Sequence, residues 1–306
     1  MSFRPIRLIP SNTKIDFVSK RWFAFSVSIL LVVITIISLA TRGLNLGIDF
    51  KGGILIEAKN EHAVDIGSMR EDLNKLGLGE VELQQFGSPN DVLIRIQRQE
   101  GDESIQIKAV QSVRDKLGAG YEYRRVEVVG PTVGSELLRA GVMATIFAML
   151  AIGVYVAVRF EWQFGVAAFI ATLHDVVATV GLFSVLQLDF NLTTVAALLT
   201  LAGYSINDTV VVFDRIRETL RRQKSHDLRA VINDSVNQTL SRTVMTAGMT
   251  LLALLPLVFM GGSTLFNFSA ALTWGILIGT YSSIYVAAAL LLYMPPLRRI
   301  EVKKKR

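Results

Sequence analysis

Ionisable side chains interrupt two long apolar segments of this 306-residue chain. Asp208 lies toward one end of segment 192–213, and Asp175, preceded by His174, lies near the middle of segment 164–186. A charge inside a bilayer costs about 2.5 to 3.5 kcal/mol on insertion scales, so each carboxylate needs a partner or a function. A carboxylate that alternates between ionised and protonated forms could carry protons through a membrane. Asp208 is the stronger candidate.

Several polar residues lie close to Asp208 in the sequence. Tyr204 and Ser205 precede it by about one helical turn and could donate hydrogen bonds to its carboxylate, and Asn207 is adjacent to it. Arg242 opens another apolar segment, from which its long guanidinium could reach toward Asp208. We therefore predict that Asp208 exchanges a proton and pairs with Arg242, and that Tyr204, Ser205, Thr243 and Thr246 are supporting polar residues. Asp175 and His174 form a second polar position within the membrane. A purely structural role between helices remains the alternative for these residues.

Two hydrolytic chemistries fit the sequence less well. Paired aspartates on neighbouring segments would suit an intramembrane aspartyl protease, but the His-Asp and Asn-Asp contexts differ from the Tyr-Asp and Gly-x-Gly-Asp contexts of such enzymes. His62, His174 and His226 fall in three different predicted compartments, and the chain has no cysteine, so a metal site is not expected. We predict a protein that is not an enzyme, with protons as coupling ion and no other cofactor.

The segments that must position these residues are long and apolar. Hydrophobic residues make up 51% of the chain and charged residues 19%, against about 25% charged in soluble domains. Stretches of about 20 apolar residues are long enough to cross a bilayer. We predict an α-helical polytopic membrane protein with six transmembrane helices at 22–40, 137–158, 164–186, 192–213, 243–261 and 266–292. The first span is interpreted as an uncleaved anchor, because it is longer than the apolar core of a signal peptide.

The distribution of basic residues predicts the orientation. Of the 32 Lys and Arg residues, five precede the first span, seven lie between 215 and 242, and six follow the last span. By the positive-inside rule, the basic N-terminus 1–21, the segment 214–242 and the basic tail 293–306 are cytoplasmic, and 41–136 lies outside. The net charge of +6 is thus explained by topology, and nucleic-acid binding is not expected.

Two basic segments are expected to contact the bilayer surface. The tail 303–306 is most simply a membrane-surface anchor. The segment 214–242 is amphipathic and is suited either to lie on the cytoplasmic membrane surface or to pack beneath the spans. Its apolar face consists of Leu228, Val231, Ile232, Val236 and Leu240.

The exterior segment 41–136 alternates between strand and helix patterns. The order is β-α-β-β-α-β, with strands at 53–59, 80–86, 92–96 and 121–129, which predicts an α+β ferredoxin-like periplasmic domain. Nothing in it indicates catalysis, so we expect a docking module. A glycine-rich segment precedes it and contains Gly47, Asp49, Gly52 and Gly53. Without a Gly-Lys-Ser/Thr ending, this segment is better interpreted as a tight entry to the first strand than as a phosphate loop.

Several motifs together resemble one family. They are Gly-Ile-Asp-Phe-Lys-Gly-Gly at 47–53, Ala-Gly-Tyr-Ser-Ile-Asn-Asp-Thr-Val-Val-Val-Phe-Asp-Arg-Ile-Arg-Glu at 202–218, Leu-His-Asp at 173–175, Ser-Arg-Thr at 241–243 and Phe-Met-Gly-Gly at 259–262. The chain resembles the SecD/SecF family of bacterial protein-export membrane proteins, within the RND (resistance-nodulation-division) superfamily.

The resemblance implies an inner-membrane subunit of the accessory Sec complex, working beside SecD, YajC and the SecYEG channel on a translocating preprotein. It implies that Asp208 carries protons down the proton-motive force with Arg242 as its partner, and that Asp175 and Asn207 support it. Six spans and one exterior domain are half of the RND pattern, so SecD is expected as a homologous six-span partner. Two alternatives remain: a half-size RND-type exporter of small molecules or lipids, and a structural scaffold of a membrane complex.

Overall fold

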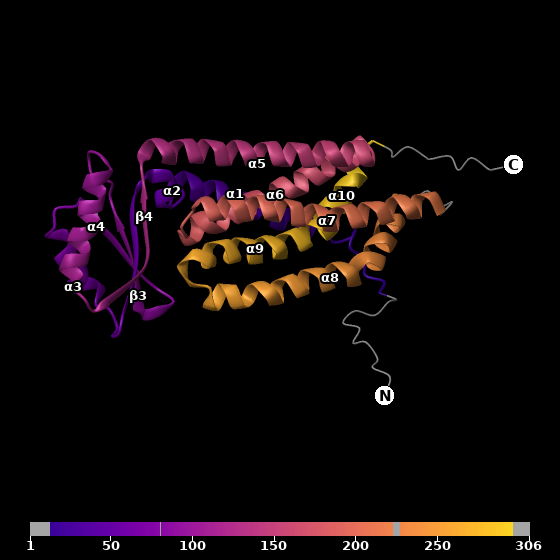
Figure 1. Cartoon of the computed structure of the whole chain (residues 1–306). Coiled ribbons are helices and arrows are strands. Elements are labelled where there is room, and N and C mark those ends of the chain that lie inside the picture. Colours follow the sequence, from indigo (N-terminus) through magenta and orange to yellow (C-terminus); the bar gives the residue numbers. More distant parts are fainter. Residues whose placement is uncertain (1–12, 80, 223–226, 296–306) are drawn as a thin grey trace, which may run out of the picture.

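A helical bundle with a small sheet domain at one end forms this protein (Figure 1). The computed structural model describes residues 13–79, 81–222 and 227–295. The predictions made for the first twelve residues of the basic N-terminus, for His226 and for the tail 303–306 lie outside the described residues.

Within the described residues, six helical segments are long and apolar enough to cross a membrane, so the chain is a multi-pass membrane protein. They are α1 (Arg21–Thr41), α5 (Pro131–Arg159), α6 (Trp162–Leu186), α7 (Leu192–Arg222), α8 (Leu228–Met260) and the segment Leu265–Tyr293. This last segment consists of α9 (Gly262–Ser282), a π-helical turn η1 (Ser283–Ala287), α10 (Ala288–Leu290) and a 3₁₀ turn η2 (Leu291–Tyr293). Each predicted span falls on one of these segments.

Helix α6 lies inside the bundle, where it contacts α1, α5, α7 and α9. Small residues let its neighbours approach closely: a Cβ added at Gly165 would lie 2.5 Å from the Cβ of Ala157, and one added at Gly181 would collide with Thr35 of α1. Close contact between helix backbones replaces the hydrophobic driving force that is missing between helices in lipid.

The segment 214–242 is not a separate surface helix. Helix α7 continues to Arg222, and the residues from Leu228 onward form the first turns of α8. Val231, Ile232 and Val236 are buried in one core cluster together with residues of α6 and α7. Of the two arrangements considered, the structure therefore has this apolar face packed beneath the spans. The surface-lying arrangement is wrong because the apolar face is already covered by protein.

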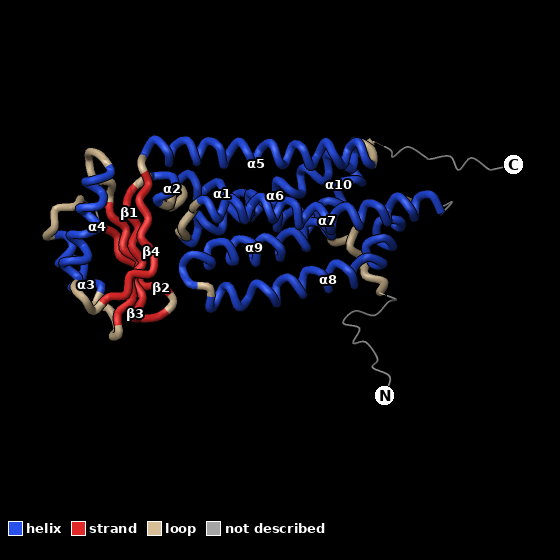
Figure 2. The backbone as a smooth tube through the Cα atoms, viewed as in Figure 1, coloured by secondary structure: helices blue, strands red, loops and turns tan. Residues whose placement is uncertain are grey.

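The sheet domain (residues 53–129) has the predicted ferredoxin-like architecture. Its elements are β1 (Gly53–Asn60), α3 (Ile66–Asn74), β2 (Val81–Phe86), β3 (Ser88–Ile96), α4 (Glu103–Leu117) and β4 (Tyr121–Val129). The strands form an antiparallel sheet in the order β2-β3-β1-β4. Helices α3 and α4 cover the face of the sheet that is turned away from the bundle (Figure 2), where Ile56, Ile94, Leu73 and Val113 form a core.

Candidate functional site

Asp175 lies at the centre of a hydrogen-bonded cluster that joins three helices. Its carboxylate is fully buried. Oδ2 accepts hydrogen bonds from Ser205 Oγ of α7 at 2.5 Å and from Ser282 Oγ of α9 at 2.8 Å. Oδ1 lies 3.0 Å from Nδ1 of His174. Both carboxylate oxygens thus have polar neighbours, so the carboxylate can stay buried between α6, α7 and α9, whereas Nε2 of His174 has no hydrogen-bond partner among the described residues.

The end of α9 is shaped to reach this cluster. A Cβ added at Gly279 would lie 3.3 Å from the Cβ of Ser205 and 3.4 Å from Asp175 Oδ2, so glycine permits the close approach of α9. The π-helical turn η1 begins directly after Ser282, and Oγ of Ser283 lies 2.9 Å from Oγ1 of Thr209 on α7. Wide turns of this kind are frequent at functional sites. Two consecutive serines thus bind two different helices.

Asp208 occupies a different and less satisfied site, between α7 and α8. Its side chain is 3% exposed. Oδ1 is 3.5 Å from Thr246 Oγ1, at the limit of a hydrogen bond, and Oδ2 has no hydrogen-bond partner among the described residues. The buried hydroxyl of Thr243 also lacks a partner in the part of the chain that the structure describes. An unpartnered buried carboxylate oxygen is costly, and binding a proton would relieve that cost.

Arg242 forms no ion pair with Asp208 within 4.0 Å among the described residues, but its positive charge is close enough to act on the Asp208 carboxylate. Its side chain is exposed, and Thr246, one turn further along α8, contacts the carboxylate instead. Successive residues are rotated by about 100° around a helix, so similar depth in the membrane does not ensure that two side chains meet. Arg242 nevertheless lies one turn from the Asp208 contact, and its carbonyl oxygen, 3.1 Å from Thr246 Oγ1, competes with Asp208 for the single proton of that hydroxyl.

The other predicted neighbours of Asp208 point elsewhere. Ser205 binds Asp175, and the Tyr204 hydroxyl lies 3.3 Å from Oγ1 of Thr250 on α8. Asn207 is exposed, and its side chain has no hydrogen bond within the described residues. The predicted proton-pathway and supporting residues therefore divide between two clusters instead of surrounding one carboxylate.

The glycine-rich segment binds the start of α7. Its residues Ile48–Lys51 form the short helix α2, and Asp49 Oδ2 accepts a hydrogen bond from the Leu192 backbone N–H at 2.8 Å. A side chain from a distant part of the sequence thus caps the helix that carries Asp208. Gly52 and Gly53 have φ of +75° and +131°, which only glycine adopts easily, and they turn the chain into β1. The segment is both the predicted entry to the first strand and a clamp on α7.

A second contact between the sheet domain and the bundle involves Arg95 of β3. Its guanidinium forms ion pairs with Asp189, in the loop between α6 and α7, and with Glu82 at 3.5 Å. Burial lowers the pKa of Arg95, while the Glu82 carboxylate opposes that shift. Asn45 Nδ2 also donates a hydrogen bond to Asp189 Oδ1, at 2.9 Å. The loop before α7 is therefore held from both sides.

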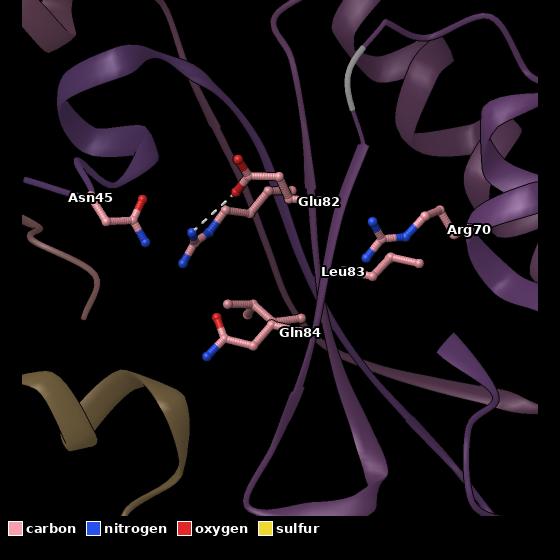
Figure 3. A pocket seen from close by; sticks show the side chains of 7 residues that line it. Asn45, Arg70, Glu82, Leu83 and Gln84 are labelled. Atoms are coloured by element: carbon pink, nitrogen blue, oxygen red, sulfur yellow. Dashed lines mark ion pairs between the residues drawn. The ribbon is translucent and has the colours of Figure 1, made fainter. Parts of the chain in front are cut away.

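The cavity beside this contact is polar. It has a volume of about 310 Å³, and Glu82 and Gln84 lie on one side of strand β2 and Arg70 on the other (Figure 3). The remaining lining residues are Asn45, Leu83, Leu93 and Arg95. A wide apolar pocket would have favoured the export of small apolar molecules or lipids. This charged lining does not favour that alternative.

The sequence reasoning missed Ser282, Ser283 and Thr209. The available signal was the Tyr-Ser-Ser interruption of the last apolar segment, at 281–283. It also missed the ion pair of Arg95 with Asp189, because a charged residue in a loop outside the spans gives no signal of its own in the sequence.

The fold and the site define a multi-pass membrane protein in which buried carboxylates lie on helices that are tied to a small sheet domain. Residues 109–296 match the family model "Protein export membrane protein SecD/SecF, C-terminal", and residues 37–59 match "SecD/SecF GG Motif". Protein translocase subunit SecF of Rickettsia rickettsii is 45% identical over 295 residues, which cover 95% of each chain. The SecF subunit of Rickettsia prowazekii is 44% identical over 293 residues, covering 95% of this chain and 94% of the relative.

A solved structure gives the same result. The crystal structure of SecDF from Thermus thermophilus, described as a translocon-associated membrane protein, superimposes with a TM-score of 0.81 at 36% identity. The match covers 94% of this chain but 39% of the SecDF chain. SecDF in its super-membrane-facing form has a TM-score of 0.67. The chain therefore belongs to the SecD/SecF family of protein-export membrane proteins.

Proposed function

We propose that this chain is an accessory subunit of the Sec protein-export machinery. In this proposal it uses the proton-motive force together with SecD to promote movement and release of preproteins across the bacterial inner membrane. The observation that supports the proton step is the buried Asp208 carboxylate with one oxygen unpartnered. The role is that of a transport helper without a catalytic step, and protons are its coupling ion.

Protonation would change the contacts of Asp208. The neutral acid can donate a hydrogen bond and tolerates burial, whereas the ionised form favours a cation and polar donors. Arg242, one turn from the Thr246 contact, is the cation on α8 that could turn toward an ionised Asp208. Each charge that crosses a potential of about 100 mV gains about 2.3 kcal/mol, which is enough to bias a conformational equilibrium about fiftyfold.

Movement of α7 would be transmitted to the sheet domain. Asp49 caps the first residue of α7, and Arg95 holds the loop that precedes it. Asp175 ties α7 to α6 and α9 through Ser205. A proton-linked shift of α7 is therefore proposed to move the exterior domain, which would assist the emerging polypeptide.

A homologous six-span partner, SecD, would complete the pathway. Its proposed contact is the exposed face of α7 at Gly203 and Asn207, where a Cβ added at Gly203 meets no atom within 4 Å. Polar Asn207 within a span is unfavourable against lipid and better suited to contact with another helix. YajC and the SecYEG channel are the further proposed partners, with both termini of this chain in the cytoplasm.

The test is export of a model secretory protein into inner-membrane vesicles that contain SecYEG, SecD and either native chain or Asp208→Asn, each with and without a proton gradient. The variant keeps the size of the side chain and removes its proton exchange. We expect the gradient to stimulate export with the native chain but not with Asp208→Asn. Ser269→Ala, a buried change on α9 away from both aspartates, should retain the stimulation. Equal stimulation of the native chain and Asp208→Asn would refute the proton-carrier role and favour the scaffold alternative.

A further inference from the structure

The guanidinium groups of two arginines lie near one phenyl ring, on elements at the end of the bundle away from the sheet domain (Figure 1). The guanidinium carbon of Arg159, the last residue of α5, lies 5.3 Å from the centroid of the Phe160 ring. The guanidinium carbon of Arg217, on α7, lies 5.7 Å from the same centroid. Both distances are within the range of cation–π attraction, so one ring organises two cations from different helices.

The ring is held rigidly in the protein core. Phe160 is 8% exposed, and its ring centroid lies 5.8 Å from that of Phe164. Phe164 in turn packs edge-on against Phe213 of α7 at 5.0 Å. Arg217 follows Phe213 by one helical turn, so the same aromatic cluster fixes the positions of both arginines. A preformed pair of donors loses less entropy when a ligand binds.

Among the ion pairs of the described residues, none involves either guanidinium of this arginine pair. The Nε atom of Arg217 is buried and has no hydrogen-bond partner in the described part of the chain. Two like charges around one ring repel each other, and an anion that accepts hydrogen bonds from both would remove that repulsion.

We propose that the phosphate of an anionic phospholipid binds between Arg159 and Arg217. Guanidinium groups match phosphate oxygens in a bidentate geometry. The neighbouring surface of α5 fits acyl chains, since Val158, Tyr155 and Val154 are 82%, 65% and 63% exposed along the helix. An anionic headgroup is favoured over a zwitterionic one, because an ammonium group would add a third cation to the pair. This site is independent of the proposed proton pathway.

The experiment is native mass spectrometry of the purified chain in detergent, titrated with phosphatidylglycerol or with phosphatidylethanolamine of the same acyl chains. The native chain should bind the first lipid about tenfold more tightly than the second. Arg159→Gln combined with Arg217→Gln should abolish this preference. The matched control combines Arg221→Gln with Arg222→Gln, which removes two exposed charges at the same end of the bundle, and should change the preference by less than about twofold.

A second variant tests the ring itself. Phe160→Leu keeps both charges and an apolar side chain but removes the aromatic face, so it should weaken binding of phosphatidylglycerol several-fold. A thermal melt of each variant identifies those that fail to fold. Equal binding of the two lipids by the native chain would overturn the proposal. So would equal loss of preference in the control pair, because binding would then depend on total charge alone.

Discussion

Removing the hydroxyl of Ser282 should destabilise the bundle more than removing that of Ser269 on the same helix. Both serines are fully buried. Ser269 Oγ donates to the Leu265 carbonyl of its own helix at 2.7 Å, whereas Ser282 Oγ donates to the Asp175 carboxylate at 2.8 Å. Ser282→Ala and Ser269→Ala share the change in helix propensity and in size. The difference between them therefore isolates the bond to Asp175.

The size of this difference follows from the acceptor. A hydrogen bond to a charged group contributes about 1.5 to 3 kcal/mol in soluble proteins. Bonds between membrane helices average about 0.6 kcal/mol and reach about 1.7 kcal/mol. Because this carboxylate is fully buried, we expect a difference of about 1 to 2 kcal/mol between the two variants, or roughly 2 to 6 °C in Tm.

The assay is thermal unfolding in detergent, together with a double-mutant cycle. In an Asp175→Asn background the acceptor is neutral, so the Ser282→Ala penalty should fall to about 0.5 to 1 kcal/mol. Equal Tm values for Ser282→Ala and Ser269→Ala would show that the Asp175 cluster does not stabilise the bundle. An unchanged penalty in the Asp175→Asn background would show that the carboxylate charge is not involved.

Three further predictions concern the ends of the bundle. In Gly134→Ala the new Cβ would lie 2.6 Å from a backbone oxygen of α2, so we expect the free energy of unfolding, measured by thermal unfolding, to fall by about 1 to 3 kcal/mol. In the control Gly248→Ala the new Cβ meets no atom within 4 Å, so this change should be neutral or stabilising. Asp49→Ala removes the acceptor of the Leu192 N–H at a cost of about 1 kcal/mol, while Asn191 still accepts from the Thr194 N–H, so amide exchange at Leu192 should speed up about fivefold, and unchanged exchange would contradict the capping role. The Ser19 backbone N–H lowers the pKa of Asp16, so the stability that this carboxylate provides is present above its ordinary pKa of about 3.9 and is lost as pH falls through the lower folded value. The protection of the segment before α1 against amide exchange, measured relative to the intrinsic rate at each pH, should therefore fall in this acidic range in the native chain, but not in an Asp16→Asn variant.

The spans and the sheet domain could be predicted because their signals are local. A run of about 20 apolar residues has few alternatives to crossing a bilayer. Alternating strands such as 92–96, between helices with one apolar face, specify a half-buried sheet. The fate of segment 214–242 could not be decided in this way, because an apolar face fits lipid and protein equally well. Only the packing against Phe213 and Ile216 distinguishes the two.

Which side chains meet at the candidate site depends on the rotation of each helix about its axis, and the sequence does not give that rotation. Asp175, His174 and Asp208 were identified because a charge in a span is conspicuous at any rotation. The partners of these residues were not identified correctly, because moving by one residue along a helix turns the side chain by about 100° around the axis. Arg242 and Ser205 were predicted to contact Asp208, from depth in the membrane and from sequence distance. In the structure Thr246 is the residue that contacts Asp208, and Ser205 binds Asp175.

The contacts at the start of α7 are strong compared with the energy that one proton supplies. The Asp49 cap contributes about 1 kcal/mol. The bonds from Asn45 and Arg95 to the Asp189 carboxylate contribute about 1.5 to 3 kcal/mol each. Their sum exceeds the roughly 2.3 kcal/mol that one charge gains across 100 mV. In the proposed function, a single protonation of Asp208 is therefore too weak to detach α7 from Arg95 of the sheet domain and from residues 45–49, which lead into that domain, so a shift of α7 moves these contacts with it.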